Sequence, residues 1–422
     1  MNIKIQTSNL QLPASIKITG SKSETNRLLL LQALYPNIML ENISKSDDSE
    51  VMTKALTFDN KSEAIPPLGA RGLDIHHAGT AMRFLTAYFA QKEDSEIILT
   101  GSPRMQERPI AILVDALKQL GADVDYLKNV GFPPIKIKGK KITKNKVSLP
   151  ANVSSQYVSA LLLIAPKLEN GLELTLEGEI TSIPYIKMTL ALLKEIGVET
   201  SFENNLIKVK HLFSIPPLGV RGLIESDWSS ASYFYSIIAL SEIGTQITLS
   251  SYKKNSLQGD SALIEIYKNF GVETTFESNS IILKKSNNHN AQLTTYNQNN
   301  APDIAQTIAV TCFGLGIGCH LTGLHTLKIK ETDRLEALKV ELTKLGAEIS
   351  ITNDSLTLKS SSIINSDIKI ATYQDHRMAM AFAPLALKTN IIIEDAEVVS
   401  KSFPTFWDDL KSIGFNISEI IS

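Results

Sequence analysis

One pattern of apolar and polar positions recurs along the chain: an apolar helical run, a glycine, and then two short alternating segments. A glycine just past a helix supplies the positive φ that a C-terminal cap needs. The pattern therefore predicts repeated β/α units, each with a helix that ends at its glycine. These glycines lie about 75 residues apart, at Gly121, Gly197, Gly271, Gly346 and Gly414.

The segments after the glycines predict β-hairpins. In residues 202–209 and 276–283, alternating positions flank a polar turn, which is typical of two paired strands. The period exceeds the ~20–50 residues of solenoid repeats, and a chain of 422 residues has room for about six units, the weakest near residues 34–44. We therefore expect an α/β protein with two domains of three units each.

Composition and charge narrow the function classes. The chain is 43% hydrophobic and 20% charged, and its net charge is −2, so no overall basic field favours nucleic acid. No signal-peptide pattern begins the chain, and no apolar run approaches the ~20 residues that span a bilayer. We expect a cytoplasmic protein without membrane association. Cys312 and Cys319 lie in an apolar segment, and we expect buried free thiols.

Candidate chemistry begins in residues 20–27, GSKSETNR, which carry Lys22, Arg27 and three hydroxyl groups between a strand-like run and an apolar helical run. A helix N-terminus attracts anions through its free N–H groups and its dipole. The spacing of a P-loop is absent. The segment predicts an anion-binding site, and a capped helix start with solvated charges remains the alternative.

Similar groups recur at other predicted helix starts, in residues 78–83, 103–109, 154–156, 330–334 and 375–377. Each motif alone is weak, because a serine there is usually a cap and charges four residues apart usually form an exposed ladder. Repeated units of one architecture would, however, bring these helix starts to one face of each domain. The sequence therefore predicts a cleft for small polyanions with phosphate and carboxylate groups. Its seven candidate cations are Lys22, Arg27, Arg108, Lys330, Arg334, Arg377 and Lys401.

A nine-residue segment is duplicated. Residues 65–73 recur almost unchanged as residues 215–223, with Pro-Pro-Leu-Gly in each. Two prolines and two glycines indicate a rigid turn. A pair of matched functional loops and an insertion tolerated at exposed loops both remain open, and we assign no chemistry to either copy.

Taken together and in this order, the motifs resemble the EPSP synthase family, whose members transfer the enolpyruvyl group of phosphoenolpyruvate to shikimate 3-phosphate. The resemblance covers essentially the whole chain, including residues 182–185, 227–233, 302–303 and 401–404. It implies two domains, each of three βαβαββ units in an inverse α/β barrel. Residues 1–19 with 226–422 would form one domain and residues 20–225 the other, with the active site in a cleft that closes on its ligands.

The resemblance also implies roles for individual residues. The shikimate 3-phosphate site would comprise Lys22, Ser23, Arg27, Ser154, Ser155, Gln156, Ser182, Tyr185, Asp303 and Lys330. The phosphoenolpyruvate site would comprise Lys22, Gly79, Arg108, Gln156, Arg334, Arg377 and Lys401. In catalysis Asp303 would be the base for the 5-hydroxyl, Glu331 the acid for the methylene carbon, and Lys22 a group that stabilises charge or shares proton transfer.

The implied reaction needs neither a metal nor an organic cofactor. Both substrates are phosphate- and carboxylate-bearing anions with roughly three negative charges each at neutral pH, and the lysines and arginines supply the compensating charge. No cluster of residues has metal-ligand spacing either. We expect a monomer whose partners are its two small-molecule substrates.

Two alternatives have distinct signatures. The related enolpyruvyl transferase that acts on UDP-N-acetylglucosamine usually has a reactive cysteine in a glycine-rich loop, and the corresponding residues 103–109 contain none. A non-catalytic anion-binding relative would gain nothing from Asp303 and Glu331 among its cations.

Departures from the family pattern include Phe84 in place of Pro and Ile183 in place of Lys. We expect these to affect substrate affinity and the response to glyphosate.

Overall fold

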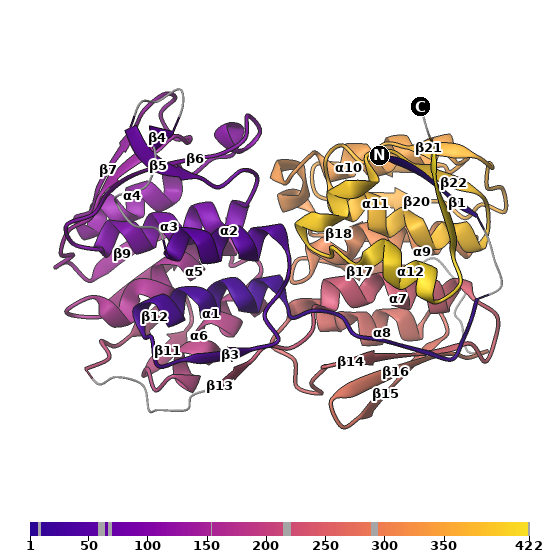
Figure 1. Cartoon of the computed structure of the whole chain (residues 1–422), viewed down its shortest axis with the longest axis horizontal. Helices are drawn as coiled ribbons and strands as arrows, with labels where there is room; N and C mark the ends of the chain where they lie inside the picture. The colour runs from indigo at the N-terminus through magenta and orange to yellow at the C-terminus, as the bar shows by residue number, and fades with distance from the viewer. Residues whose placement is uncertain are drawn as a thin grey trace. The chain divides into compact units, whose positions relative to one another are not determined.

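The chain folds into two compact units (Figure 1). The computed structural model describes residues 1–6, 10–57, 64–65, 70–152, 154–213, 221–287 and 294–420. Unit 1 consists of Met1–Ser21 and Glu225–Ser422, and unit 2 of Lys22–Ile224. The two segments at the edge of unit 1 are paired, because Gly20 and Ser226 form an antiparallel bridge and the Ser21 N–H donates to the Glu225 carbonyl over 2.7 Å.

Unit 1 contains three four-stranded sheets, each built from two parallel strands and two antiparallel ones with helices between them. The first repeat is β2 (Ala14–Ile16), α7 (Trp228–Leu240), β14 (Gln246–Ser250), η3 (Gly259–Ala262), α8 (Leu263–Lys268), β15 (Val272–Glu277) and β16 (Ser280–Lys285). The second is β17 (Thr294–Asn297), η4 (Pro302–Ile304), α9 (Ala305–Gly314), β18 (Cys319–Thr322), η5 (His325–Ile329), α10 (Arg334–Lys344), β19 (Ile349–Ile351) and β20 (Leu356–Leu358).

The third repeat of unit 1 is completed by the N-terminal strand. Its elements are β21 (Ile368–Ile370), α11 (His376–Phe382), η6 (Ala383–Leu387), β22 (Ile391–Ile393), η7 (Ala396–Lys401), α12 (Phe406–Ser412), β23 (Asn416–Ile420) and β1 (Asn2–Gln6). Strand β1 lies between β22 and β23 and is antiparallel to both. The two ends of the chain are therefore joined in one sheet.

Unit 2 contains two comparable sheets and one small one, in the orders β11-β12-β10-β9, β4-β5-β6-β8-β7 and β13-β3. Its first elements are α1 (Lys22–Leu34), β3 (Met39–Glu41), α2 (Asp47–Leu56), β4 (Ala64–Ile65), β5 (Ala70–Asp74), α3 (Gly79–Gln91), β6 (Glu96–Thr100), η1 (Met105–Glu107), α4 (Ala111–Leu120), β7 (Asp123–Tyr126) and β8 (Ile135–Lys138). The others are β9 (Lys146–Pro150), α5 (Ser155–Ile164), η2 (Ala165–Lys167), β10 (Leu172–Glu177), α6 (Ile183–Glu195), β11 (Thr200–Glu203), β12 (Leu206–Val209) and β13 (Arg221–Leu223).

The repeat predicted from the glycines is confirmed. All five have positive φ, between 77° at Gly271 and 105° at Gly121. A Cβ at Gly121 or Gly197 would meet no atom within 4 Å, so the backbone conformation, and not crowding, favours glycine at these two positions. Both predicted hairpins are present, as the antiparallel pairs β11–β12 and β15–β16.

The first predicted unit differs from the others. Helix α1 ends at Leu34 without a glycine, and strand β3 pairs in parallel with β13 at the far end of unit 2. The two strands of this sheet are thus supplied by opposite ends of the unit, which a local repeat pattern does not reveal. The centres of the duplicated loops, residues 66–69 and 214–220, lie outside the described residues.

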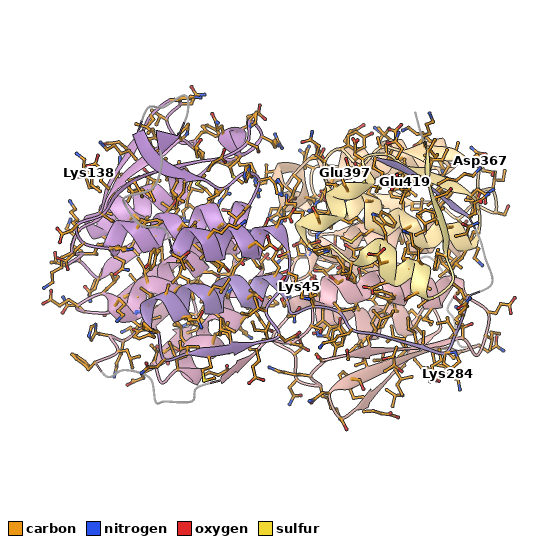
Figure 2. All side chains as sticks on the ribbon, viewed as in Figure 1. Lys45, Lys138, Lys284, Asp367, Glu397 and Glu419 are labelled. Atoms are coloured by element: carbon orange, nitrogen blue, oxygen red, sulfur yellow. The ribbon has the colours of Figure 1, made fainter. Side chains whose placement is uncertain are left out.

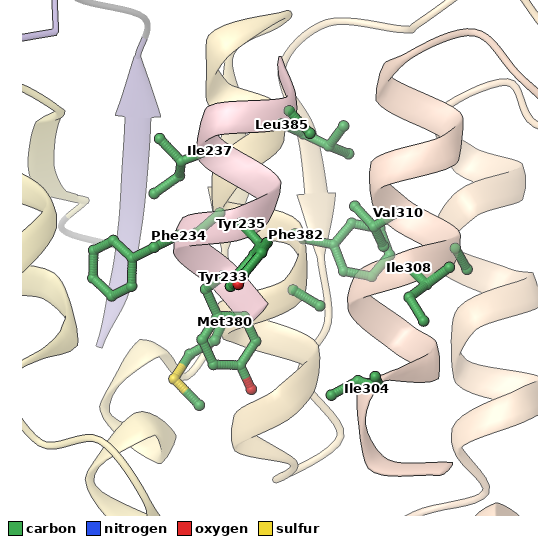
Figure 3. Close-up of a cluster of buried hydrophobic side chains, with 14 of the residues drawn as sticks. Tyr233, Phe234, Tyr235, Ile237, Ile304, Ile308, Val310, Met380, Phe382 and Leu385 are labelled. Carbon is green, nitrogen blue, oxygen red and sulfur yellow. The ribbon is translucent and has the colours of Figure 1, made fainter. Parts of the chain in front are cut away.

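The core of unit 1 surrounds three helices that are buried on nearly every side, α7, α9 and α11. Such helices are apolar all round, unlike an amphipathic surface helix. Figure 3 shows their side chains together, among them Tyr235, Val310 and Phe382, each completely buried. The N-terminal ends of these inner helices lie together, because Arg377 of α11 donates to the Asp303 carbonyl just before α9 and to Ser229 of α7. Polar residues at these ends contribute to the site described below.

Ordinary charged side chains lie on the surface. Figure 2 labels six of them, all exposed: Lys45, Lys138, Lys284, Asp367, Glu397 and Glu419. Cys312 and Cys319 are buried free thiols, as predicted. None of the helices in the described part of the chain has the length and apolar character required to cross a membrane.

Candidate active site

Arg334 is the centre of a buried ionic network in unit 1. Its side chain is 2% exposed. Nε donates to Asp375 Oδ2 over 2.6 Å, Nη1 to Asp303 Oδ1 over 2.8 Å, and Nη2 to Glu331 Oε2 over 2.7 Å. A guanidinium group has five N–H donors in one plane, so this single residue fixes three carboxylates relative to one another.

Three further cations contact the same carboxylates. Lys330 Nζ lies 3.3 Å from Asp303 Oδ1, and Lys401 Nζ lies 2.8 Å from Glu331 Oε1. Arg377 Nη2 lies 3.6 Å from Asp303 Oδ2, and its Nη1 donates to the Asp303 carbonyl over 3.1 Å. Asp303 therefore contacts three cations and Glu331 two.

Local structure explains how these residues meet. Asp303 lies in η4, just before α9, and Lys401 ends η7. Asp375 caps α11 by accepting from the Arg377 N–H over 2.9 Å. Helix α10 begins at Arg334 with Asp333 as its cap. Residues 330–334 had been predicted as the helix start, but Lys330 precedes the helix and does not belong to its first turn. Lys330 nevertheless reaches the same Asp303 oxygen as Arg334.

The charged side chains of this network shift one another's pKa values. Burial alone would raise the pKa of Asp303, but Lys330, Arg377 and Arg334 hold that pKa well below its usual range. Burial would lower the pKa of Arg334, and its carboxylate partners, Asp375 foremost, raise it instead. Asp303 and Arg334 are thus both charged at neutral pH, with their geometry set before any anion arrives.

One acidic residue in unit 1 was not predicted from the sequence. Asp260 is buried in η3, and its Oδ2 accepts a short hydrogen bond from Ser229 Oγ. Ser229 Oγ in turn accepts from Arg377 Nη2 over 3.2 Å. Asp260 Oδ1 has no hydrogen-bond partner among the described residues. Burial, with Asp303 nearby, raises the pKa of Asp260 to about 6, so its ionisation changes close to neutral pH.

The candidate residues of unit 2 surround a different kind of centre. Arg27 is buried, and it donates to Thr189 Oγ1 over 2.8 Å, Ser159 Oγ over 2.9 Å and the Ser23 carbonyl over 2.8 Å. Its guanidinium lies 5.5 Å from the centre of the Phe84 ring. Burial lowers the pKa of Arg27 to about 10, which leaves it charged at neutral pH.

Arg27 therefore joins three helices through neutral groups. Ser23 lies in the first turn of α1, Ser159 on α5 and Thr189 on α6. A second link is direct, because Gln156 Nε2 at the start of α5 donates to Thr80 Oγ1 at the start of α3 over 3.2 Å. The starts of α3 and α5, two of the predicted helix starts, are thus in direct contact within unit 2.

Two cations of unit 2 have few partners. Lys22 begins α1, and its Nζ lies 3.8 Å from Asp48 Oδ2, a buried carboxylate that was not predicted from the sequence. The Arg108 guanidinium packs against Gly79, where a Cβ would lie 2.5 Å from Nη1. Arg108 Nε is buried and has no hydrogen-bond partner among the described residues. A buried guanidinium with an unused donor is a good candidate for binding an anion.

The predicted hydroxyl groups occupy helix starts. Ser154 caps α5 by accepting from the Gln156 N–H over 3.4 Å, and Ser155 is the first residue of the helix. Ser182 precedes α6 in the left-handed conformation, with φ 54°, and Tyr185 lies in the first turn. Such N-terminal turns present N–H and O–H donors to a phosphate group.

The sixteen predicted site residues thus divide between the units. Unit 1 contains Asp303, Lys330, Glu331, Arg334, Arg377 and Lys401. Unit 2 contains Lys22, Ser23, Arg27, Gly79, Arg108, Ser154, Ser155, Gln156, Ser182 and Tyr185. No group of His, Cys, Asp and Glu placed to hold a metal ion was found in the described part of the chain.

Comparison with known proteins identifies the family. The family model described as EPSP synthase (3-phosphoshikimate 1-carboxyvinyltransferase) matches residues 7–410. The chain belongs to the EPSP synthase family. A 3-phosphoshikimate 1-carboxyvinyltransferase from Bacteroides fragilis (strain YCH46) is 44% identical over 414 residues, covering 96% of this chain and 97% of the relative. One from Histophilus somni (strain 2336) is 36% identical and covers 96% and 98%.

Solved structures agree on the fold. The EPSP synthase from Acinetobacter baumannii superposes with a TM-score of 0.77 at 22% identity, covering 99% of this chain and all of that one. The enolpyruvyl transferase NikO from Streptomyces tendae gives a TM-score of 0.72 at 11% identity, covering 100% and 99%. The predicted α/β fold class, that of the EPSP synthase family, is therefore confirmed.

Proposed function

We propose that this protein transfers the enolpyruvyl group of phosphoenolpyruvate to the 5-hydroxyl of shikimate 3-phosphate and releases phosphate. The observation that carries the proposal is the buried network in which Arg334 holds Asp303 and Glu331 among three further cations. Curated relatives over nearly the whole chain are named as enzymes of this reaction. The proposed setting is the cytoplasm, with the monomer as the working form.

The proposed reaction is an addition followed by an elimination. Asp303 takes the proton of the 5-hydroxyl, whose oxygen attacks the carbon that bears the phosphate ester. Glu331 gives a proton to the methylene carbon, which becomes a methyl group in a tetrahedral ketal. In the second stage Glu331 takes a proton back from the methyl group, the double bond re-forms, and phosphate leaves with the proton held by Asp303.

The pairing of both carboxylates with cations gives substrate binding a role in their protonation. Lys330 and Arg377 bind Asp303, while Lys401 binds Glu331. An incoming phosphate or carboxylate competes for these cations, because each can form the same charge-assisted hydrogen bonds. Substrate binding then weakens the existing pairs, which makes Asp303 a stronger base and favours the proton on Glu331.

The residues of unit 2 provide the remaining contacts in this proposal. Ser154, Ser155 and Ser182 would bind the phosphate of shikimate 3-phosphate at helix starts, and Arg108 beside Gly79 would bind phosphoenolpyruvate. Lys22 would contact both substrates. Both units would act on one pair of substrates in a cleft between them, and domain closure would exclude water from the ketal.

The thiol-dependent alternative receives no support from this structure. Cys312 and Cys319 are buried in the core of unit 1 and lie on α9 and β18, away from any helix start. The non-catalytic alternative leaves unexplained why two carboxylates are held within the cationic network.

Release of inorganic phosphate tests the proposal. With both substrates at millimolar concentration, we expect phosphate and an enolpyruvyl ether of shikimate 3-phosphate in equal amounts. Phosphoenolpyruvate alone should release none. Absence of phosphate release with both substrates, or release that does not require shikimate 3-phosphate, would contradict the proposed function.

A further inference from the structure

A buried carboxylate outside the proposed catalytic set holds the loop that carries Asp375 and Arg377. Glu341 lies near the end of α10 and is completely buried. Its Oε1 accepts from the Tyr373 hydroxyl over 2.6 Å, and its Oε2 accepts from the Ala371 N–H over 3.2 Å. The carboxylate therefore bonds twice to the segment of residues 371–375.

That segment has an unusual backbone. Tyr373 and Gln374 both have positive φ, 53° and 55°, and neither is a glycine. Residues with a side chain adopt this conformation at an energetic cost, so two in succession persist only where other contacts hold them. The side chains of Tyr373 and Gln374 are exposed, so packing in the core does not hold these two residues in place. Hydrogen bonds restrain them instead: the two bonds to Glu341, and the bond from the Asp375 N–H to the Thr372 carbonyl over 2.8 Å.

Helix α10 contacts this segment at both of its ends. Arg334, its first residue, binds Asp375, and Glu341 follows seven residues later. Seven residues are about two helical turns, so both side chains project from the same face. The strained residues Tyr373 and Gln374 thus lie between two anchors on one rigid helix.

We propose that Glu341 and Tyr373 are positioning residues for phosphoenolpyruvate. They keep the segment in its left-handed conformation, which sets Asp375 against Arg334 and starts α11 so that Arg377 reaches Asp303. The inference rests on the proposed function for the identity of the anion. Glu341 and Tyr373 themselves touch neither Arg377 nor the other candidate substrate residues in any described contact, so their effect is indirect.

The cleanest variant is Tyr373→Phe, which removes the hydroxyl and leaves Glu341 with two partners, the Ala371 N–H and Lys344, whose Nζ lies 2.8 Å from Oε2. We expect the Michaelis constant for phosphoenolpyruvate to rise about tenfold, the equivalent of one strong hydrogen bond to a charged group. The constant for shikimate 3-phosphate should stay within about twofold, because eight of its ten assigned residues are in unit 2 and the other two, Asp303 and Lys330, lie outside the segment of residues 371–375. Glu341→Gln should show the same selectivity.

Tyr235→Phe is a matched control. It also removes one hydroxyl bond in unit 1, between Tyr235 and Thr274 of β15 over 2.8 Å, and neither residue belongs to this loop. Hydrogen exchange of residues 370–377 gives a readout independent of activity: Tyr373→Phe should accelerate it and Tyr235→Phe should not. Calorimetric titration with phosphoenolpyruvate should give the same tenfold weakening as the kinetics.

These measurements separate the two proposals. If the unaltered chain releases no phosphate, the proposed function fails. The role of Glu341 is still decided by two other measurements, the hydrogen exchange of residues 370–377 and the affinity for phosphoenolpyruvate in the titration. Unchanged exchange and unchanged affinity in both loop variants would overturn the inference. So would parallel losses for both substrates that match the Tyr235→Phe control, because they would indicate a general stability effect only.

Discussion

The two units hold their arginines in opposite ways. In unit 1, Arg334 lies among three carboxylates and shares two of them, Asp303 and Glu331, with Lys330, Arg377 and Lys401. In unit 2, Arg27 is held by hydroxyl and carbonyl oxygens and by aromatic rings. The network in unit 1 thus contains carboxylates, which can exchange protons, while the oxygens that accept hydrogen bonds from Arg27 in unit 2 belong to neutral groups, with the Glu24 carboxylate as a further charge nearby.

The difference separates proton transfer from anion binding. Cations beside a carboxylate favour its charged form and weaken it as a base, and its protonation responds when anions displace the cations. Neutral partners leave an arginine with its full charge, so they organise an anion site without opposing it. We therefore propose that unit 1 supplies the two carboxylates of the acid–base chemistry and the cations beside them, and that unit 2 supplies most of the contacts to shikimate 3-phosphate.

Replacement of Arg334 should give the largest effect. Arg334→Met leaves three carboxylates without their shared cation, and we expect a loss of about 3–5 kcal/mol in the free energy of unfolding and no measurable turnover. Arg334→Lys keeps the charge but not the planar fork, so we expect recovery of most of the stability and little of the rate. Urea unfolding and steady-state kinetics measure both. Equal turnover numbers in Arg334→Lys and the unaltered protein would show that the planar guanidinium group is not required.

Glu331→Gln tests the proton-transfer role. The amide keeps the shape and one acceptor but cannot deliver a proton, so we expect the turnover number to fall about 10²–10⁴-fold. Binding of shikimate 3-phosphate should change little. Single-turnover kinetics with calorimetric titration separate these quantities, and an unchanged turnover number would exclude Glu331 as the acid.

Asp260 and Asp303 should affect stability with opposite pH dependence. The pKa of Asp260 is raised to about 6 in the folded protein, so the folded state binds more protons than the unfolded state between about pH 4 and 6. Stability from this group is present below pH 4 and is lost as the pH rises through 6. The depressed pKa of Asp303 gives stability that is lost as the pH falls.

Asp260→Asn should therefore stabilise the protein at pH 7, by an amount on the order of 2–3 kcal/mol, and by almost nothing at pH 4. The matched variant Asp303→Asn should lower stability at pH 7. Urea unfolding at a series of pH values measures both. A gain in Asp260→Asn that does not depend on pH would contradict the assigned ionisation.

Gly79→Ala should give the smallest effect, and one confined to unit 2. The new methyl group would lie 2.5 Å from Arg108 Nη1, so the flexible arginine must move. We expect the Michaelis constant for phosphoenolpyruvate to rise about tenfold, the loss of roughly one good hydrogen bond, with the constant for shikimate 3-phosphate unchanged. A crystal structure in which Arg108 keeps its place would contradict this explanation.

Local signals in the sequence predicted much of this molecule. A glycine after each helix reports a backbone conformation that few other residues adopt, so the repeat was visible. Clusters of polar residues at helix starts located the candidate site in both units. The start of α10 was misplaced by treating Lys330 as helical, although Asp333 is a standard capping residue directly before Arg334.

The features that were missed depend on distant partners. Asp260, Asp48 and Glu341 are single acidic residues in unremarkable sequence, and only folding brings Ser229, Lys22 and Tyr373 to them. The first unit was hidden for the same reason, because β3 finds its partner β13 at the other end of unit 2. No pattern within a short window contains such information.

Deuterium incorporation tests the central claim most directly, that a carboxylate of unit 1 adds a proton to the methylene carbon and removes one again. The reaction is run in D₂O with both substrates, and the product is analysed by mass spectrometry. We predict deuterium in the vinyl group of the product, because the methyl group of the ketal mixes solvent-derived and original hydrogens. A product formed at the normal rate without deuterium would contradict the account.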